Sequence, residues 1–300
     1  MQPRDWAGVL PAITTPFKSD LSVDEGALAT HVRWMMDSGC RGIVALGSLG
    51  ESATLAFAEK VRILEVCRDA LGSRGHLVAG IAGLATAECV ALAKAAEKAK
   101  CDGLMALPAY VYVGDDRETE AHYGAVIGAT GLSCMLYNNP VAYGVDVSPE
   151  QLVSLCKRHS NLHATKDSSG NVRRVAAIRG ALGDRIRILV GMDDVVLESV
   201  AMGAVGWVAG LVNALPVESV RLFDLAIAGK AQEAWTLYDW FLPLLRLDTV
   251  PQFVQLIKLV QEEVGKGSAR VRPPRLQLEG EELARVRALI KERLSRRPAF

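Results

Sequence analysis

Lys166 is the residue of this sequence that is best placed for covalent chemistry. It directly continues the apolar run Leu162–Thr165, whereas most other lysines fall on polar helix faces or in loops. A lysine at the end of a buried strand is poorly hydrated, and this favours the neutral amine that can attack a carbonyl. The alternative is a strand-end lysine that only pairs with a carboxylate such as Asp167. Position alone therefore makes Lys166 a candidate nucleophile.

Two further features could serve such a lysine. Tyr137 lies at the end of another apolar run, and its phenol could carry protons during attack on a carbonyl. The turn Gly47-Ser48-Leu49-Gly50 could hold a carboxylate through its backbone N–H groups. Taken singly, a strand-end tyrosine more often packs in a core, and the turn is a weak motif. It is neither GxGxxG nor a P-loop, which counts against a nucleotide cofactor, and the five histidines show no metal-ligand spacing.

Short apolar runs that alternate with amphipathic segments must position these side chains. The runs are apolar throughout, as expected for parallel strands buried on both faces. Eight such units predict a (β/α)₈ TIM barrel, in which the carboxyl ends of the strands meet at one mouth. A doubly wound sheet shares the alternation and is the alternative. The predicted strands are Val9–Ile13, Gly42–Leu46, Leu77–Ile81, Gly103–Leu107, Cys134–Asn138, Leu162–Thr165, Ile188–Val190 and Gly206–Ala209.

From Pro216 onward the strand pattern stops and helical periodicity continues. The sequence therefore predicts a barrel over residues 1–215 and a C-terminal helical segment over 216–300 that packs on it. Its predicted helices cover 216–229, 232–247, 252–264 and 281–296, and the second is expected to kink or break at Pro243. The arginines at 270, 272 and 275 are expected to form a solvated surface.

Composition narrows the class of protein. The 300 residues carry 34 Lys and Arg against 34 Asp and Glu, and 50% are hydrophobic. A neutral, apolar chain is neither disordered nor a good nucleic-acid binder. The six cysteines form no CxxC or zinc spacing, which favours reduced thiols and a cytoplasmic protein.

The uncharged stretches 123–145 and 199–217 are broken by glycine and proline, so we interpret them as buried elements and not as membrane spans.

Five motifs in register resemble one family. GSLGES at 47–52, Tyr110, YNNP at 137–140, KDSSG at 166–170 and GMDD at 191–194 are similar to the dihydrodipicolinate synthase / N-acetylneuraminate lyase family. The similarity runs along nearly the whole chain. It implies a barrel with C-terminal helices and a class I mechanism through a lysine imine, without metal or organic cofactor. It also implies a homotetramer, or a homodimer with similar contacts.

The resemblance assigns roles to four candidate catalytic residues. Lys166 matches the Schiff-base lysine, and Tyr137 matches the tyrosine that moves protons to and from the substrate. Ser48 matches a hydroxyl residue of a proton relay. Tyr110 matches the far end of that relay and, in the family, reaches into the site of a neighbouring subunit.

Further positions are implied to bind the substrate. Gly47 and Leu49 belong to the turn that matches the site of the 2-oxo acid carboxylate. Gly191 and Asp193 match positions that contact the distal part of the substrate in some members. Tyr143 follows the YNNP motif and is expected to shape the pocket.

Departures from the family pattern bear on the substrate. Synthase members carry an arginine where this chain has Ala142, which argues against dihydrodipicolinate synthase. Leu49 replaces a second hydroxyl and Gly210 replaces a serine of the sialic acid lyases. YNNPVAYGVD with GSLGE looks closest to the 1-pyrroline-4-hydroxy-2-carboxylate deaminases.

The favoured hypothesis is a Schiff-base-forming lyase that acts on a small 2-oxo acid or its cyclic imine, by dehydration and deamination or by retro-aldol cleavage. Both routes need the same lysine and tyrosine. A synthase-type condensation of pyruvate is one alternative. A non-catalytic 2-oxo acid binding protein is the alternative from another class.

Overall fold

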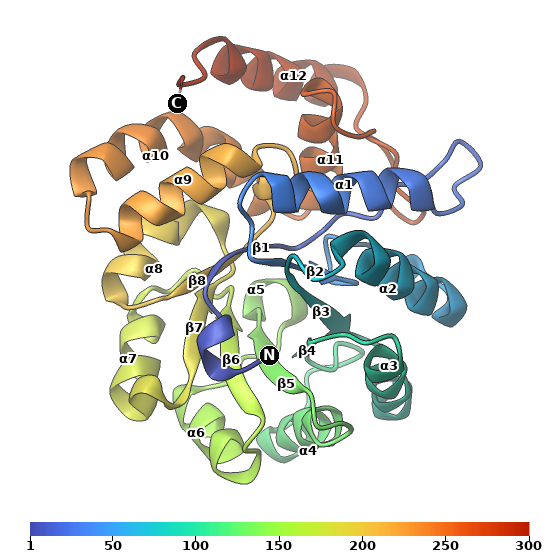
Figure 1. The fold of residues 1–300 in the computed structure, drawn as a ribbon, viewed down its shortest axis with the longest axis vertical. Helices are drawn as coiled ribbons and strands as arrows, with labels where there is room; N and C mark the ends of the chain where they lie inside the picture. Colours follow the sequence, from blue (N-terminus) through green and yellow to red (C-terminus); the bar gives the residue numbers. More distant parts are fainter. Residues whose placement is uncertain (300) are drawn as a thin grey trace.

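Eight parallel strands form a ring in the computed structural model, which describes residues 1–299 (Figure 1). Neighbouring strands pair in parallel from β2 round to β1, and a bridge between Ala12 and Val44 closes the ring between β1 and β2. The predicted (β/α)₈ barrel is therefore confirmed. The strands are β1 Gly8–Pro11, β2 Gly42–Ala45, β3 His76–Ile81, β4 Gly103–Ala106, β5 Ser133–Asn138, β6 Leu162–Asp167, β7 Arg187–Val190 and β8 Gly206–Ala209.

Helices surround the ring, as Figure 1 shows. Their starts follow local chemistry: Ser148 accepts a hydrogen bond from the Gln151 amide in a capping box, with Pro149 in the first helical position. The short helix α5 follows β5 directly at the barrel mouth. The helices of this part are α1 Glu25–Asp37, α2 Phe57–Leu71, α3 Thr86–Lys98, α4 Asp116–Ile127, α5 Pro140–Tyr143, α6 Pro149–Arg158, α7 Arg173–Leu182 and α8 Val196–Met202.

Four more helices complete the chain: α9 Pro216–Ile227, α10 Ala231–Leu245, α11 Phe253–Glu263 and α12 Gly280–Ser295. Helix α9 contacts α8 and β1 and so closes the outer ring of helices. Helix α10 continues through Pro243 and ends two residues later, where the 3₁₀ turn η6, Arg246–Asp248, begins. The division of the chain at residue 215 stays a prediction.

The strand residues form the core. Every residue of β2, β4, β5 and β8 is buried, which explains why these strands are largely apolar. Trp6 is fully buried at the amino end of the barrel, and its indole donates to Ser133 Oγ at 2.7 Å. The candidate nucleophile Lys166 lies at the opposite end of the barrel, near the carboxyl end of β6.

A buried ion pair fastens the C-terminal segment to the barrel. Lys258 of α11 donates to Glu51 at 2.5 Å, and both side chains are almost fully buried. The Arg272 amide donates to the second oxygen of Glu51, and its guanidinium binds Glu59. Glu51 follows the turn at 47–50, so these contacts tie the C-terminal segment to the barrel mouth.

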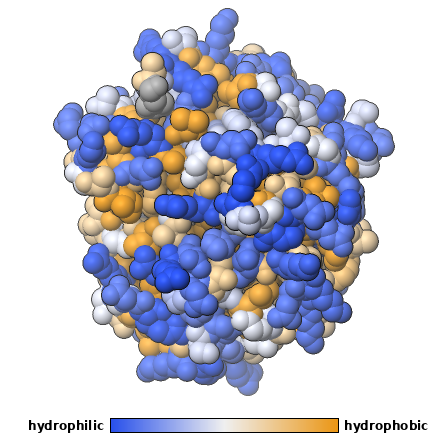
Figure 2. Space-filling view, in the orientation of Figure 1, coloured by the Kyte–Doolittle hydropathy of each residue, from blue (hydrophilic) through white to orange (hydrophobic). Residues whose placement is uncertain are grey.

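The surface is mixed in polarity. Figure 2 shows polar side chains across most of one face, interrupted by smaller apolar patches. None of the helices in residues 1–299 has the length and hydrophobicity needed to cross a membrane.

Candidate active site

Lys166 lies at the mouth of the barrel, in register with Tyr137 on the neighbouring strand. Only 6% of Lys166 is exposed, and its Nζ lies 4.2 Å from the centre of the Tyr137 ring. Asp167, which was one possible carboxylate partner for Lys166, forms an ion pair with Arg174 at 3.3 Å instead. Among the described residues Lys166 forms no ion pair. Its amine is thus held by packing beside a phenol and is open to a substrate.

The YNNP motif holds Tyr137 in place. The amide of Asn139 donates to the Tyr137 hydroxyl at 2.8 Å, and Tyr123 donates to the Tyr137 carbonyl at 2.8 Å. Asn138 points elsewhere and accepts from the Val147 amide at 2.9 Å. The two asparagines therefore have separate tasks: one orients the phenol and the other fixes the loop that follows.

A hydrogen bond joins Ser48 to the phenol of Tyr143. The Tyr143 ring lies between two other tyrosines, with its centre 6.0 Å from that of Tyr137 and 5.6 Å from that of Tyr110. Burial raises the pKa of Tyr143, and the nearby Tyr137 raises it further. Tyr143 is therefore a neutral phenol that can both donate and accept. It was expected only to shape the pocket, but the structure places it in direct contact with the relay hydroxyl.

The turn at residues 47–50 offers free backbone donors. Among the described hydrogen bonds, the amides of Ser48 and Leu49 donate to no protein acceptor. The turn is held in shape by a left-handed Leu46, with φ of 63°, and by the close approach of Gly50 to the Ile13 carbonyl. Two unpaired amides beside Lys166 are suited to binding a carboxylate.

These groups share one cavity of about 440 Å³. Gly191 borders it and must be glycine, because a Cβ there would lie 2.5 Å from Lys166 Cε. The cavity is lined by, among others, Gly47, Ser48, Leu49, Tyr137, Asn139, Tyr143, Lys166, Gly191, Gly210, Asp248 and Arg275.

Two predicted site residues lie outside this lining. Asp193 is fully buried behind it, where its carboxylate accepts from Trp207 Nε1 at 2.9 Å and from the amides of Gly210 and Leu211. Burial raises its pKa to about 6, although these hydrogen bonds act in the opposite direction. Tyr110 contacts the ring of Tyr143. Substrate contact by Asp193 and a relay role for Tyr110 stay predictions.

Comparison with known proteins decides the family. The model of the dihydrodipicolinate synthetase family matches residues 5–293. The chain belongs to this family. A relative from Agrobacterium fabrum, named 4-hydroxy-tetrahydrodipicolinate synthase, is 33% identical over 267 residues, which are 89% of this chain and 91% of the relative. The protein is accordingly a lyase of this family.

Solved structures of the family share the fold. The 4-hydroxy-tetrahydrodipicolinate synthase from Methylacidiphilum fumariolicum SolV has a TM-score of 0.91 at 29% identity and covers 97% of each chain. The chloride-inhibited dihydrodipicolinate synthase from Acinetobacter baumannii, complexed with pyruvate, has a TM-score of 0.89 at 28% identity and covers 97% of this chain and 98% of its own.

Two charged residues of the cavity, Asp248 and Arg275, lie outside the sequence motifs of the dihydrodipicolinate synthetase family and were not predicted. Asp248 comes from η6 and Arg275 from the loop before α12. The prediction that Arg272 and Arg275 lie on a solvated surface is wrong. Arg275 lines the cavity, and Arg272 is bound to Glu51 and Glu59. Only the docking of the C-terminal segment brings these residues to the mouth, and no local pattern encodes it.

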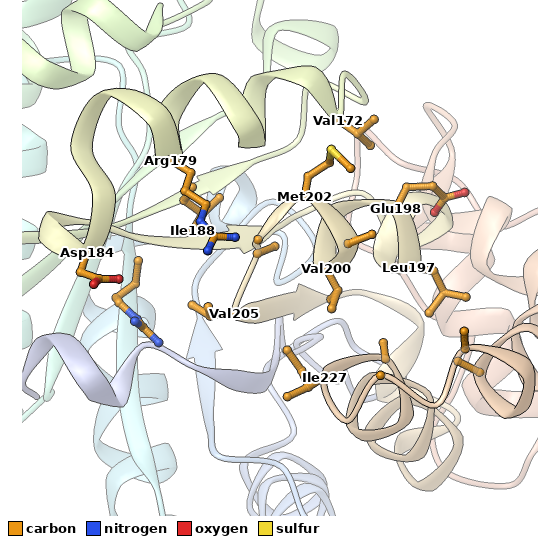
Figure 3. Close-up of a pocket in the computed structure, with 18 of the residues that line it drawn as sticks. Val172, Arg179, Asp184, Ile188, Leu197, Glu198, Val200, Met202, Val205 and Ile227 are labelled. Atoms are coloured by element: carbon orange, nitrogen blue, oxygen red, sulfur yellow. The ribbon is translucent and has the colours of Figure 1, made fainter.

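A larger cavity lies away from this site, between α7, β7, α8 and the α9–α10 turn (Figure 3). Apolar side chains dominate it, including Leu197, Val200, Met202 and Ile227, with Arg179 at one side. Its lining residues within the described chain include no lysine, tyrosine, histidine or cysteine. It therefore offers no nucleophile for the chemistry of the family.

Proposed function

We propose that the protein forms a Schiff base between Lys166 and C2 of a small 2-oxo acid, or of its cyclic imine, and then breaks a bond at C4. One observation carries this proposal: the Lys166 amine lies unpaired in the cavity beside the Tyr137 phenol and the free amides of Ser48 and Leu49. The two amides are suited to bind the carboxylate on C1, and the Lys166 amine is suited to attack the carbonyl carbon C2. The Tyr137 phenol is suited to carry the protons that this attack requires.

The first half of the reaction uses these residues in order. Lys166 attacks C2 of a 2-oxo acid, and the oxygen of the resulting carbinolamine takes a proton from Tyr137 and leaves as water. With a cyclic imine, the ring nitrogen takes the proton instead and leaves C2 as an amine. Asn139 holds the Tyr137 hydroxyl in position for this transfer. The hydroxyls of Ser48 and Tyr143 provide a path by which protons return. The protonated imine then withdraws electrons from C3, which supplies the activation without a metal or organic cofactor.

The second half depends on the substrate. Loss of a C4 hydroxyl gives a dehydration, followed by deamination when the substrate is a hydroxylated pyrroline carboxylate. Cleavage between C3 and C4 gives a retro-aldol reaction. Ala142 lines the cavity where the resemblance places the arginine of the synthases, and this supports a lyase in place of a condensation.

A synthase-type condensation of pyruvate is the second candidate. It is supported by the name of the Agrobacterium relative and by the pyruvate bound to the Acinetobacter structure. The guanidinium of Arg275 lines the same cavity and offers a positive charge that Ala142 cannot supply. A purified protein that consumes pyruvate only with an aldehyde partner, and that releases nothing from 4-hydroxy substrates, would favour this candidate.

Assembly of several copies also remains a proposal. The loop after Tyr110 exposes Val111, Tyr112 and Val113 by 60% or more. Such a loop suits contact with another copy of the chain, and the resemblance implies a homotetramer or homodimer. Light scattering on the purified protein tests this directly.

Substitution of Lys166 tests the proposed function. Lys166→Ala removes the amine, and turnover of every 2-oxo acid substrate should fall to background while the circular dichroism spectrum is retained. Lys157→Ala on the exposed face of α6 is a matched control and should keep wild-type turnover. Substantial turnover by Lys166→Ala would exclude the imine mechanism.

A further inference from the structure

Asp248 is a carboxyl group of the cavity that the mechanism above does not use. It ends η6, between α10 and α11, and lines the cavity together with Lys166. Among the described residues, its carboxylate takes part in no hydrogen bond or ion pair. Asp193, by contrast, uses both carboxylate oxygens on protein donors. Asp248 is thus the acidic side chain of the cavity that is free to meet a ligand.

Gly210 makes room for Asp248 at the end of β8. A Cβ at position 210 would lie 2.5 Å from Asp248 Cγ and closer still to Oδ1. The backbone φ of Gly210 is −95°, so the glycine is not needed for its conformation. Its small size instead lets the carboxyl group of the C-terminal segment approach the end of β8.

The surroundings of Asp248 favour its protonated form. Burial raises the pKa of Asp248 well above its ordinary value, and the neighbouring Asp193 and Asp194 raise it further, whereas Lys166 lowers it. Asp193 and Asp194 lie on the 3₁₀ turn that packs against η6, and Arg246 on η6 lies 4.0 Å from Asp194. A carboxyl group that keeps its proton can act as an acid.

We propose that Asp248 is the catalytic acid that protonates the leaving hydroxyl at C4 of a 4-hydroxy-2-oxo acid or its cyclic imine. This inference rests on the proposed function. After Tyr137 has taken a proton from C3, the enamine electron pair forms the C3–C4 double bond and the C4–O bond breaks. The oxygen takes the Asp248 proton and leaves as water, and the nitrogen is again an iminium ion.

The positions of the two proton carriers fit this division of work. Tyr137 is on β5 beside Lys166, where C2 and C3 must lie, whereas Asp248 packs at the end of β8, three strands further round the barrel. A retro-aldol reaction would instead need a base for the C4 hydroxyl. A protonated carboxyl cannot fill that role, so Asp248 favours elimination over carbon–carbon cleavage.

The test compares Asp248→Asn with the wild-type protein on three substrates. With 1-pyrroline-4-hydroxy-2-carboxylate, ammonia release should fall at least 100-fold, since an acid contributes about 10²–10⁴ to such steps. With pyruvate, which has no C4, borohydride trapping and exchange of the methyl protons in D₂O should be unchanged. With 4-fluoro-2-oxopentanoate, fluoride leaves without a proton, so its release should stay within threefold of wild type.

Two further variants guard against indirect effects. Gly210→Ala pushes the Asp248 carboxyl away without removing it and should show the same selective loss. Asp239→Asn removes an exposed carboxylate on α10 that does not line the cavity, and this variant should release ammonia at the wild-type rate.

The outcomes separate the two proposals. Failure of wild-type protein to trap pyruvate would overturn the proposed function itself. If the wild type traps pyruvate, the Asp248 inference is overturned by any of three results: wild-type ammonia release in Asp248→Asn, equal slowing of pyruvate exchange and ammonia release, or a wild-type protein that only cleaves the C3–C4 bond.

Discussion

Ser48 and Tyr143 are joined by a hydrogen bond within one subunit, and the Tyr143 ring lies between those of Tyr137 and Tyr110. The hydroxyl path from the reacting centre is therefore anchored on α5, directly after the strand that carries Tyr137. The first step of this path is present within a single chain.

Tyr143→Phe breaks the contact with Ser48 and keeps the ring. We expect exchange of the pyruvate methyl protons to slow by about tenfold to 100-fold, because proton return to Tyr137 loses its path. Proton NMR in D₂O measures this exchange. Tyr112→Phe, which changes an exposed phenol bonded to Glu118, is the control and should have no effect. A larger loss in Tyr110→Phe than in Tyr143→Phe would place the relay elsewhere.

Gly191→Ala places a methyl group 2.5 Å from Lys166 Cε. The lysine must then shift, and trapping of pyruvate by borohydride should fall at least tenfold. Gly180→Ala is the matched control, because a Cβ there meets nothing within 4 Å. In that variant trapping should be unchanged, and α7 should gain up to about 1 kcal/mol from the better helix former. Normal trapping by Gly191→Ala would show that Lys166 does not need its observed position.

Lys258→Met leaves the buried carboxylate of Glu51 without its main partner. Removing one member of a buried ion pair costs about 3–5 kcal/mol. The free energy of unfolding from urea titration should fall by this amount. Arg62→Met, which breaks exposed pairs with Glu25 and Glu65, should lower the free energy of unfolding far less, because exposed ion pairs contribute little to stability. Equal costs for the two variants would mean that the C-terminal segment is not fastened at Glu51.

His31 makes stability depend on pH. Burial lowers its pKa to about 4 from 6.5, and the hydrogen bond to Asn213 opposes this only in part. The unfolded chain therefore binds the proton more readily, so stability falls as the pH drops from about 6.5 towards 4. At pH 5 the contribution is about 2 kcal/mol.

The effect of His31 is measured against His31→Gln, which cannot titrate. The raised pKa of Asp193 gives the opposite trend, because a group with a raised pKa loses stability as the pH rises from about 4 to 6. The wild type and His31→Gln share this effect of Asp193, so it cancels when the stability changes of the two proteins are subtracted. Urea titrations at pH 7 and pH 5 should show the wild type losing about 2 kcal/mol more than His31→Gln. Parallel losses would show that His31 is not held neutral.

The barrel can be predicted from the sequence because each strand is recognisable from its own residues. Strands buried on both faces are apolar throughout, and the predicted run 103–107 matches β4 to within one residue. Lys166 was expected to follow its strand, whereas β6 continues through it to Asp167. The motifs also place Tyr137 and the turn at 47–50 at the mouth, since parallel strands end on the same side.

The remaining part of the site depends on long-range packing. Asp248 and Arg275 reach the cavity only because α11 and the loop after it dock on the barrel through Glu51. The partner of Ser48 is set by where α5 turns after β5, a detail of loop geometry. Neither the docking of the C-terminal segment nor the contact between Ser48 and Tyr143 has a local sequence signature. Sequence motifs identify individual residues, but they do not show which residues are in contact.

Borohydride trapping with pyruvate, read by intact mass and peptide mapping, tests the central claim most directly. The imine mechanism predicts one reduced pyruvate adduct per chain, located on Lys166 and absent from Lys166→Ala. An adduct on another lysine, or none in folded protein, would contradict it.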